Sequence, residues 1–187
     1  MSNPSTTYAP ELGERLRELR LPTLLVTHDY GDAAALADRV GVLVEGKIVQ
    51  MGTPADLVAA PASPFVADFT GVNFLRGAAS PGAEGLTEVR LAEGGVVYST
   101  DPGSGEVGVI VFPWDVTLAR SAPADSARNR VIGPIRGLTP LGNRVRVRVG
   151  PLTAEVTAAS AEQLGLRPGE EIVATFKAAG TRLVPLG

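Results

Sequence analysis

The hydrophobic residues fall into short runs, and their spacing changes character near residue 71. In the first part of the chain, residues 10–20 carry leucines at helical spacing, and residues 32–39 form a second short helical pattern rich in Ala and Leu. Between them, residues 21–27 are apolar or β-branched without polar alternation, which is typical of a strand covered on both faces of a parallel sheet. This order of elements predicts an α/β segment.

The next segment predicts a hairpin followed by two helices. Residues 40–44 and 48–51 are apolar runs on either side of Glu45-Gly46, the pattern of strand, tight turn and strand. Two later positions place a hydroxyl residue before a proline, which is the pattern of an N-cap followed by the first helical residue. These two helix starts are Thr53-Pro54 and Ser63-Pro64.

One motif in the hairpin has the spacing of a phosphate-binding loop. Residues 41–47 fit G-x-x-x-x-G-K, but Ile48 stands where such a loop needs Ser or Thr, and no helix follows. We therefore interpret this match as part of a turn.

From about residue 76, short alternating runs joined by Gly and Pro replace the helical spacing, which favours a small all-β, OB-like barrel. We expect two domains, an α/β fragment over residues 1–75 and a β domain over 76–187, whose main unit is 126–187 after a loop at 121–125. The expected strands cover residues 87–92, 96–100, 107–112, 131–138, 144–149, 153–157 and 172–177.

The amino-acid composition excludes several kinds of functional site. The chain has 187 residues with 17 basic and 20 acidic side chains, a formal net charge of −3, no Cys and one His. These counts exclude disulfides, thiolate metal sites and His clusters, and we expect no metal site. No apolar run is long enough to span a membrane and no N-terminal signal is visible, so we expect a cytoplasmic chain. Residues 126–187 carry 9 basic and 4 acidic side chains, which favours an anionic partner there.

His28 is the first candidate for chemistry. It ends the apolar run at 21–27, and ligands of open α/β sheets bind at the carboxyl ends of strands, where a neutral imidazole can hydrogen-bond a phosphate oxygen or a water. An incidental histidine at the start of a helix explains the position equally well. We expect Asp29 to cap the following helix rather than to act as a base.

The basic part of the chain offers two further candidates. Arg144, Arg146 and Arg148 alternate with valines, so they line one face of a strand, where they protect an edge or bind nucleic acid. Nucleic-acid binding is disfavoured because residues 126–187 contain one aromatic residue and lack stacking platforms. The second candidate is a set of hydroxyl, guanidinium, amide and ammonium donors that suits a tetrahedral oxyanion: Ser126, Arg128, Asn129 and Lys177.

Residues 21–77 resemble the C-terminal end of the nucleotide-binding domain of ABC-transporter ATPases of the importer branch, with the motifs THD (27–29), ALADR (35–39), GKI (46–48), QxGTP (50–54) and PxxPFVADF (61–69). The remaining chain resembles the transport-associated OB-like (TOBE) domain in its molybdate-binding Mop variety, with the motifs SARN (126–129), LTAEVT (152–157), LGLRPG (164–169) and FKA (176–178).

The first resemblance implies that His28 is the switch histidine, which in the family contacts the γ-phosphate of Mg-bound ATP and helps to orient the attacking water. The family's P-loop, signature loop and Walker B strand with its catalytic carboxylate are not found in this sequence. Because phosphoryl transfer depends on these groups for positioning and charge stabilisation, we expect no ATP hydrolysis by this polypeptide alone. Most of the parallel sheet is missing too, so residues 21–26 either pair with another copy or belong to a loosely packed segment.

The second resemblance implies that Ser126, Arg128, Asn129 and Lys177 bind molybdate or tungstate, although alanines at 178 and 179 stand where relatives often carry a hydroxyl. The implied protein is the ATP-binding subunit of an importer for molybdate or a similar oxyanion. It would work as a homodimer docked on a membrane permease at the inner face of the cell membrane, and its second domain would support dimerisation and sense oxyanion. The alternative is a stand-alone oxyanion-binding storage or sensor module.

Overall fold

The computed structural model describes residues 15, 16, 18, 22–121 and 126–186. They divide into two compact units, one within residues 1–70 and one within 71–187, slightly before the expected boundary at 75/76. Most of the predicted helix over 10–20 and of the predicted loop at 121–125 lies outside the described residues. Each unit is described by itself.

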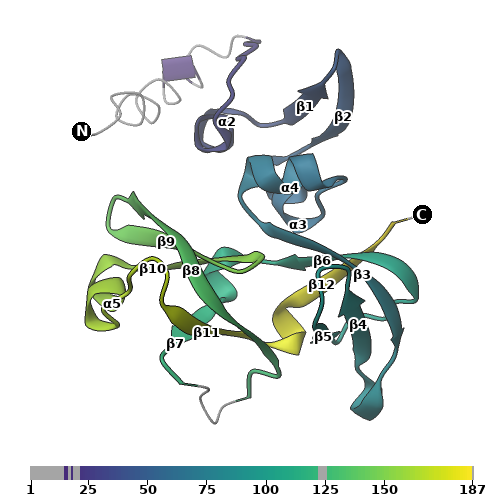
Figure 1. Ribbon diagram of the computed structural model, residues 1–187. Coiled ribbons are helices and arrows are strands. Elements are labelled where there is room, and N and C mark those ends of the chain that lie inside the picture. Colours follow the sequence, from purple (N-terminus) through teal and green to yellow (C-terminus); the bar gives the residue numbers. More distant parts are fainter. Residues whose placement is uncertain (1–14, 17, 19–21, 122–125, 187) are drawn as a thin grey trace. The chain divides into compact units, whose positions relative to one another are not determined.

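From residue 22 on, the first unit is built from the short helices α2, α3 and α4 and one hairpin, shown in purple to blue in Figure 1. Its strands β1 and β2 pair antiparallel, and Glu45 (φ 48°) and Gly46 (φ 77°) form the two-residue loop between them. Left-handed conformations at both loop positions define the tight turn that matches the twist of a hairpin. The predicted hairpin is therefore confirmed, as is the interpretation of residues 41–47 as a turn. The elements are α2 (Tyr30–Leu36), β1 (Val40–Val44), β2 (Lys47–Gly52), α3 (Pro54–Ala59) and α4 (Pro64–Thr70).

Each predicted helix cap is present. The Asp29 side chain accepts a hydrogen bond from the backbone N–H of Asp32 and caps α2. Thr53 and Asp56 form a reciprocal capping box at the start of α3, and Ser63 Oγ accepts from the N–H of Val66 in α4. These caps satisfy backbone donors that a helix start leaves without partners.

The predicted buried strand over residues 21–27 is wrong for the residues described. Residues 22–27 have no regular secondary structure, and the side chains of Leu24 and Val26 are 91% and 88% exposed. An apolar run becomes a buried parallel strand only when neighbouring strands pair with it and other elements cover it. In the described part of this unit, the sheet consists of β1 and β2 alone.

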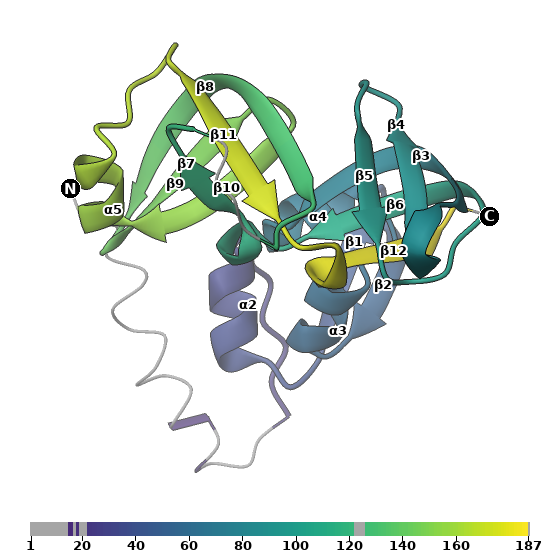
Figure 2. The same cartoon turned by 90° about the horizontal axis from the view of Figure 1, so that it is seen from below.

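The second unit is mostly β and consists of two five-stranded antiparallel sheets, each curved like half of a barrel (Figures 1 and 2). The strand orders are β12-β6-β3-β4-β5 and β10-β9-β8-β11-β7. This architecture agrees with the expected OB-like barrel. The elements are β3 (Asn73–Pro81), η1 (Ala83–Gly85), β4 (Thr87–Leu91), β5 (Val96–Ser99), β6 (Gly105–Val111), η2 (Pro113–Asp115), β7 (Thr117–Ala119), β8 (Asn129–Leu141), β9 (Arg144–Val149), β10 (Leu152–Thr157), α5 (Ala158–Gln163), β11 (Glu171–Phe176), η3 (Ala178–Gly180) and β12 (Thr181–Pro185).

The two sheets are built on the same plan. The central strands β3 and β8 both begin with Asn, and Asn73 lies opposite Val111 of β6 just as Asn129 lies opposite Phe176 of β11. The last strand of each half joins the other sheet, because β7 pairs with β11 and β12 pairs with β6. Residues 126–187, expected to be the main barrel unit, therefore donate β12 to the first sheet and receive β7 in return.

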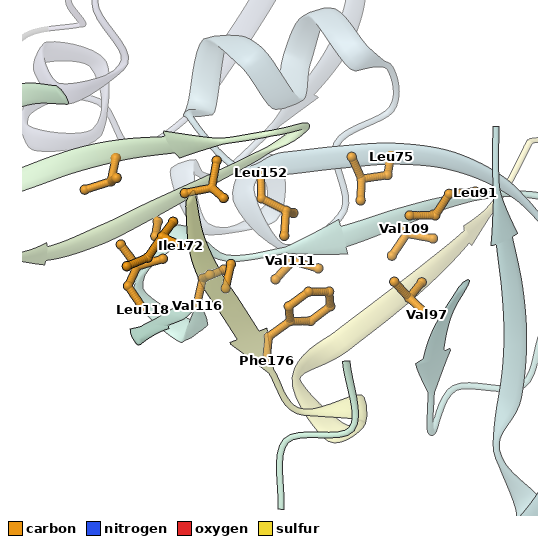
Figure 3. Packing of buried hydrophobic residues seen from close by; sticks show 14 of the residues in the cluster. Leu75, Leu91, Val97, Val109, Val111, Val116, Leu118, Leu152, Ile172 and Phe176 are labelled. Atoms are coloured by element: carbon orange, nitrogen blue, oxygen red, sulfur yellow. The ribbon is translucent and has the colours of Figure 1, made fainter. Parts of the chain in front are cut away.

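One hydrophobic core lies between the two sheets (Figure 3). Leu75, Val109 and Val111 enter it from the first sheet, and Leu152 and Phe176 enter it from the second. Because both halves contribute side chains to the same core, neither sheet buries its apolar face without the other.

Candidate functional site

The predicted oxyanion-binding residues of the second unit meet at one end of the β8–β11 ladder. Asn129 is the first residue of β8 and lies opposite Phe176, the last residue of β11. Lys177 follows directly, so the register brings it beside the segment that holds Ser126 and Arg128. The side chains of Ser126, Arg128 and Lys177 are exposed.

Asn129 is buried, and its amide is engaged by the protein. Its Oδ1 accepts a hydrogen bond from the backbone N–H of Tyr98 (2.7 Å), and its Nδ2 donates to the Tyr98 carbonyl (2.9 Å) and to Thr181 Oγ1 (3.1 Å). Since Tyr98 belongs to β5, this amide joins the two sheets. These bonds hold the start of β8, and with it Arg128, in a fixed place.

Arg128 has two partners from the other half of the unit. Its Nη1 forms an ion pair with Glu84 of η1, and its guanidinium lies 5.6 Å from the centre of the Tyr98 ring. The hydrogen bond from Arg128 and its positive charge lower the pKa of Glu84, and the same contact raises the pKa of Arg128. Sequence reasoning missed Glu84, because its 44-residue separation from Arg128 is bridged only by the fold.

Lys177 adds the second cation of the site. Its side chain is exposed, and its carbonyl accepts hydrogen bonds from Thr181 Oγ1 (2.9 Å) and from the N–H of Gly180 (3.0 Å) in the turn η3. Arg128 and Lys177 therefore place two cations at this end of the ladder, and Arg128 is paired with the carboxylate of Glu84. This arrangement suits an anion with several oxygen acceptors.

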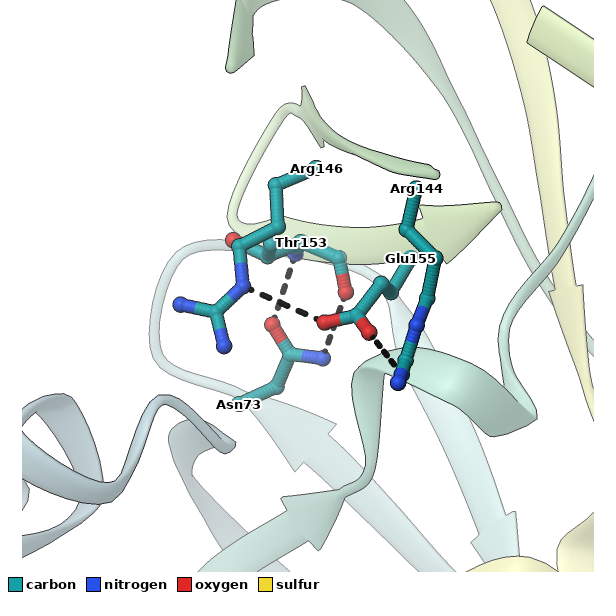
Figure 4. Close-up of polar contacts among 5 residues, drawn as sticks. All are labelled: Asn73, Arg144, Arg146, Thr153 and Glu155. Atoms are coloured by element: carbon teal, nitrogen blue, oxygen red, sulfur yellow. Dashed lines mark hydrogen bonds and ion pairs between the residues drawn. The ribbon is translucent and has the colours of Figure 1, made fainter. Parts of the chain in front are cut away.

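The corresponding place in the first half of the unit keeps the amide but lacks the cations. Asn73 Oδ1 accepts from the N–H of Thr153 (2.6 Å) and its Nδ2 donates to the Thr153 carbonyl (2.8 Å), as Figure 4 shows. By their places relative to this Asn and its partner strand, Val72 and Phe112 correspond to Arg128 and Lys177. The predicted donor set is therefore found at one of two structurally equivalent ends.

The predicted arginine stripe on β9 is partly neutralised. Glu155 of β10 lies between Arg144 and Arg146, with distances of 2.5 Å to Arg144 Nη1 and 3.3 Å to Arg146 Nε (Figure 4). The carboxylate side chain of Glu155 is only 7% exposed. The contacts favour a structural role for these two arginines on the sheet surface.

His28 lies in the first unit, on an exposed bend just before the Asp29 cap of α2. The N–H of Asp29 donates to Thr27 Oγ1 (3.1 Å), so the residues on both sides of His28 are used in the local turn. Because the expected strand before it is absent, His28 does not stand at the rim of a parallel sheet in the described chain. No group of three or more His, Cys, Asp or Glu among the described residues could hold a metal ion.

No helix in the described part of the chain is long and apolar enough to cross a membrane.

Comparison with protein families places a TOBE domain at residues 125–183. Over 174 residues the chain is 32% identical to the molybdate/tungstate import ATP-binding protein WtpC of Pyrococcus horikoshii. This alignment covers 90% of this chain and 49% of that protein. It is 34% identical over 187 residues to the sulfate/thiosulfate import ATP-binding protein CysA 2 of Chromobacterium violaceum, covering 94% and 49%. The chain thus spans about half the length of the curated relatives it matches.

Two further matches are an import protein named for polyamines and a solved structure. The spermidine/putrescine import ATP-binding protein PotA of Thermobifida fusca is 34% identical over 138 residues, covering 71% of this chain and 35% of that protein. Among solved structures, the cytoplasmic molybdate-binding protein ModG, in a form with molybdate bound, superposes with a TM-score of 0.55 at 25% identity. The match covers 60% of this chain and 96% of that one.

Proposed function

We propose that this chain, which corresponds to the C-terminal part of an ABC importer ATP-binding subunit and carries a TOBE domain, serves in the uptake of molybdate or a similar oxyanion. In the whole subunit, ATP hydrolysis drives uptake, and two subunits dock on a membrane permease at the inner face of the cell membrane. The second unit supports the dimer and senses internal oxyanion.

The observation that carries the oxyanion assignment is the meeting of Arg128 and Lys177 at the end of the β8–β11 ladder. Guanidinium and ammonium groups donate strong charge-assisted hydrogen bonds to tetrahedral oxyanions, and the nearby hydroxyl of Ser126 adds another donor. A polyamine such as the PotA substrate is itself cationic, so two cations repel it. The site therefore favours the oxyanion branch of the relatives.

Calorimetry tests this assignment. We expect the purified chain to bind molybdate, and Lys177→Gln or Arg128→Gln to weaken binding about tenfold or more, because each removes a charged donor. Arg167→Gln, which removes an exposed cation elsewhere in the same unit, is the control and should leave the affinity unchanged. Absence of heat at millimolar molybdate would refute oxyanion sensing and leave the second unit a structural role.

The described residues do not fit a Mg–ATP site on their own. His28 offers one imidazole for a γ-phosphate, Asp29 is engaged as a helix cap, and the described residues hold no cluster that could bind Mg²⁺. We propose that His28 acts only in the whole subunit. A phosphate-release assay on the purified chain is expected to show no turnover, and measurable turnover would contradict this proposal.

The alternative function is a stand-alone oxyanion store or sensor, favoured by the match that covers 96% of ModG. The two functions differ in their dependence on ATP and on assembly. Molybdate binding by the whole protein that ATP does not influence, together with absence of a permease partner in a pull-down from membranes, would favour the alternative.

A further inference from the structure

A carboxylate from the other half of the unit occupies part of the proposed oxyanion site. Glu84 forms an ion pair with Nη1 of Arg128, and the Arg128 guanidinium also lies over the Tyr98 ring. Arg128 is one of the two cations of the site. The carboxylate therefore uses a donor group that an incoming oxyanion needs.

The backbone of the turn that carries Glu84 is held in place. Glu84 has φ 58° and ψ 26°, a left-handed conformation that is unfavourable for a residue other than glycine because its Cβ atom crowds the backbone. The N–H of Gly82 donates to the Leu86 carbonyl (2.8 Å), and the N–H of Leu86 donates to the Ala83 carbonyl (3.1 Å), closing the turn. Backbone strain of this kind is often found where a side chain has a functional placement.

The contact is also easy to break. The side chains of Glu84 and Arg128 are 68% and 43% exposed, and ion pairs between exposed groups are weak because water and salt screen them. A multiply charged oxyanion that contacts Lys177 at the same time has more charge to offer Arg128 than a single carboxylate has. Displacement of the carboxylate therefore needs only a side-chain movement of Glu84.

We propose that Glu84 is an affinity-determining residue of the oxyanion site, an internal carboxylate that occupies Arg128 until an oxyanion displaces it. The inference rests on the proposed oxyanion binding. Because Arg128 is paired both before and after binding, the exchange reduces the net gain from the new contact, and the displaced carboxylate repels the bound anion. Glu84 thus raises the oxyanion concentration at which the site fills.

Glu84→Gln tests the proposal, since it removes the charge and keeps the length of the side chain. Calorimetry of the whole chain with molybdate at low ionic strength should show affinity about threefold to tenfold higher than that of the unchanged chain, a gain set by the strength of an exposed ion pair and by relief of repulsion. The gain should shrink as sodium chloride is added. Glu93→Gln, in the exposed turn between β4 and β5, makes the same change in net charge and should leave the affinity within about twofold.

The double variant Glu84→Gln/Arg128→Gln separates a direct effect from a general one. Its gain in affinity over Arg128→Gln alone should be clearly smaller than the gain of Glu84→Gln over the unchanged chain, because there is no guanidinium to release and only the relief of repulsion remains. Equal affinities of the unchanged chain and Glu84→Gln, or an equally large gain in the double variant, would overturn the role of Glu84 and leave the oxyanion site in place. Absence of binding in every variant would overturn both the site and the role of Glu84.

Discussion

The two units of the chain bury hydrophobic residues to different extents. Among the described residues, the first has a core cluster of five buried residues and leaves Leu43, Ile48 and Met51 exposed on its hairpin. The second has, again among the residues that the structure describes, a cluster of 19 buried residues to which both sheets contribute. The difference indicates that caps and a tight turn define the elements of the first unit, whereas shared burial between two halves defines the second.

The largest expected effect comes from the core of the second unit. Phe176→Ala should destabilise this unit by about 3–5 kcal/mol, because it leaves a cavity among side chains of both sheets. Urea unfolding followed by fluorescence of Trp114, the single tryptophan, reports on this unit. Leu57→Ala, in the separate core of the first unit, should leave that transition in place, and an equal shift would mean that the two units unfold as one.

The buried amides that join the two sheets rank second. Asn129→Ala removes three hydrogen bonds and leaves the Tyr98 backbone groups without this partner, so we expect a loss of about 2–4 kcal/mol. Asn73→Ala removes two bonds to Thr153 and should cost less, about 1–3 kcal/mol. The Trp114 transition measures both, with the exposed Gln163→Ala as control. A smaller loss for Asn129 than for Asn73 would contradict this ranking.

A smaller effect is expected at the capping box of the first unit. Thr53→Ala should destabilise α3 by about 1 kcal/mol, measured as faster hydrogen exchange of its amides. The hydrogen bond from the Thr53 backbone lowers the pKa of Asp56. The stabilisation that the ionised Asp56 carboxylate gives to α3 is therefore present above the ordinary carboxyl pKa. It is lost as the pH falls through the lowered pKa of Asp56. Exchange protection of α3 that does not decrease on acidification would refute this account.

The smallest effect on stability is expected on the outer face of the hairpin. Ile48→Thr should change the stability of the first unit by no more than about 0.5 kcal/mol, because Ile48 is 58% exposed. It should reduce self-association measured by light scattering, since exposed apolar strand faces favour association. Val42→Thr, on the buried face of the same hairpin, is the contrast and should destabilise clearly.

Elements that depend on neighbouring residues could be predicted from the sequence. The Glu45-Gly46 turn and the caps at Asp29, Thr53 and Ser63 need only short-range contacts, and all are confirmed. The segment 22–27 shows the opposite case, because an apolar run becomes a strand only when partner strands are present.

The central strand β3 was missed for a different reason. Its sequence includes Gly77, Ala78 and Ala79, which have low strand propensity. Gly77 is needed there, because a Cβ atom at this position would lie 2.6 Å from the Arg90 carbonyl oxygen of the paired strand. Close approach of the two strands thus requires glycine at a position where strand propensity predicts the end of a strand.

The candidate site could be predicted from the sequence only in part. The sequence motifs named Ser126, Arg128, Asn129 and Lys177, and the β8–β11 register brings these positions to one end of the ladder. The contacts of Glu84 with Arg128 and of Asn129 with Tyr98 depend on pairing between distant segments, which no local pattern specifies. That Ser126, Arg128, Asn129 and Lys177 are ligands of an oxyanion stays a prediction.

The exchange of β7 and β12 makes the covalent link between the two halves redundant. The last strand of each half pairs with a strand of the other half: β7 pairs with β11, and β12 pairs with β6. A polypeptide nicked between β7 and β8 would keep its two pieces associated, and new termini placed there by circular permutation would leave every ladder of both sheets intact.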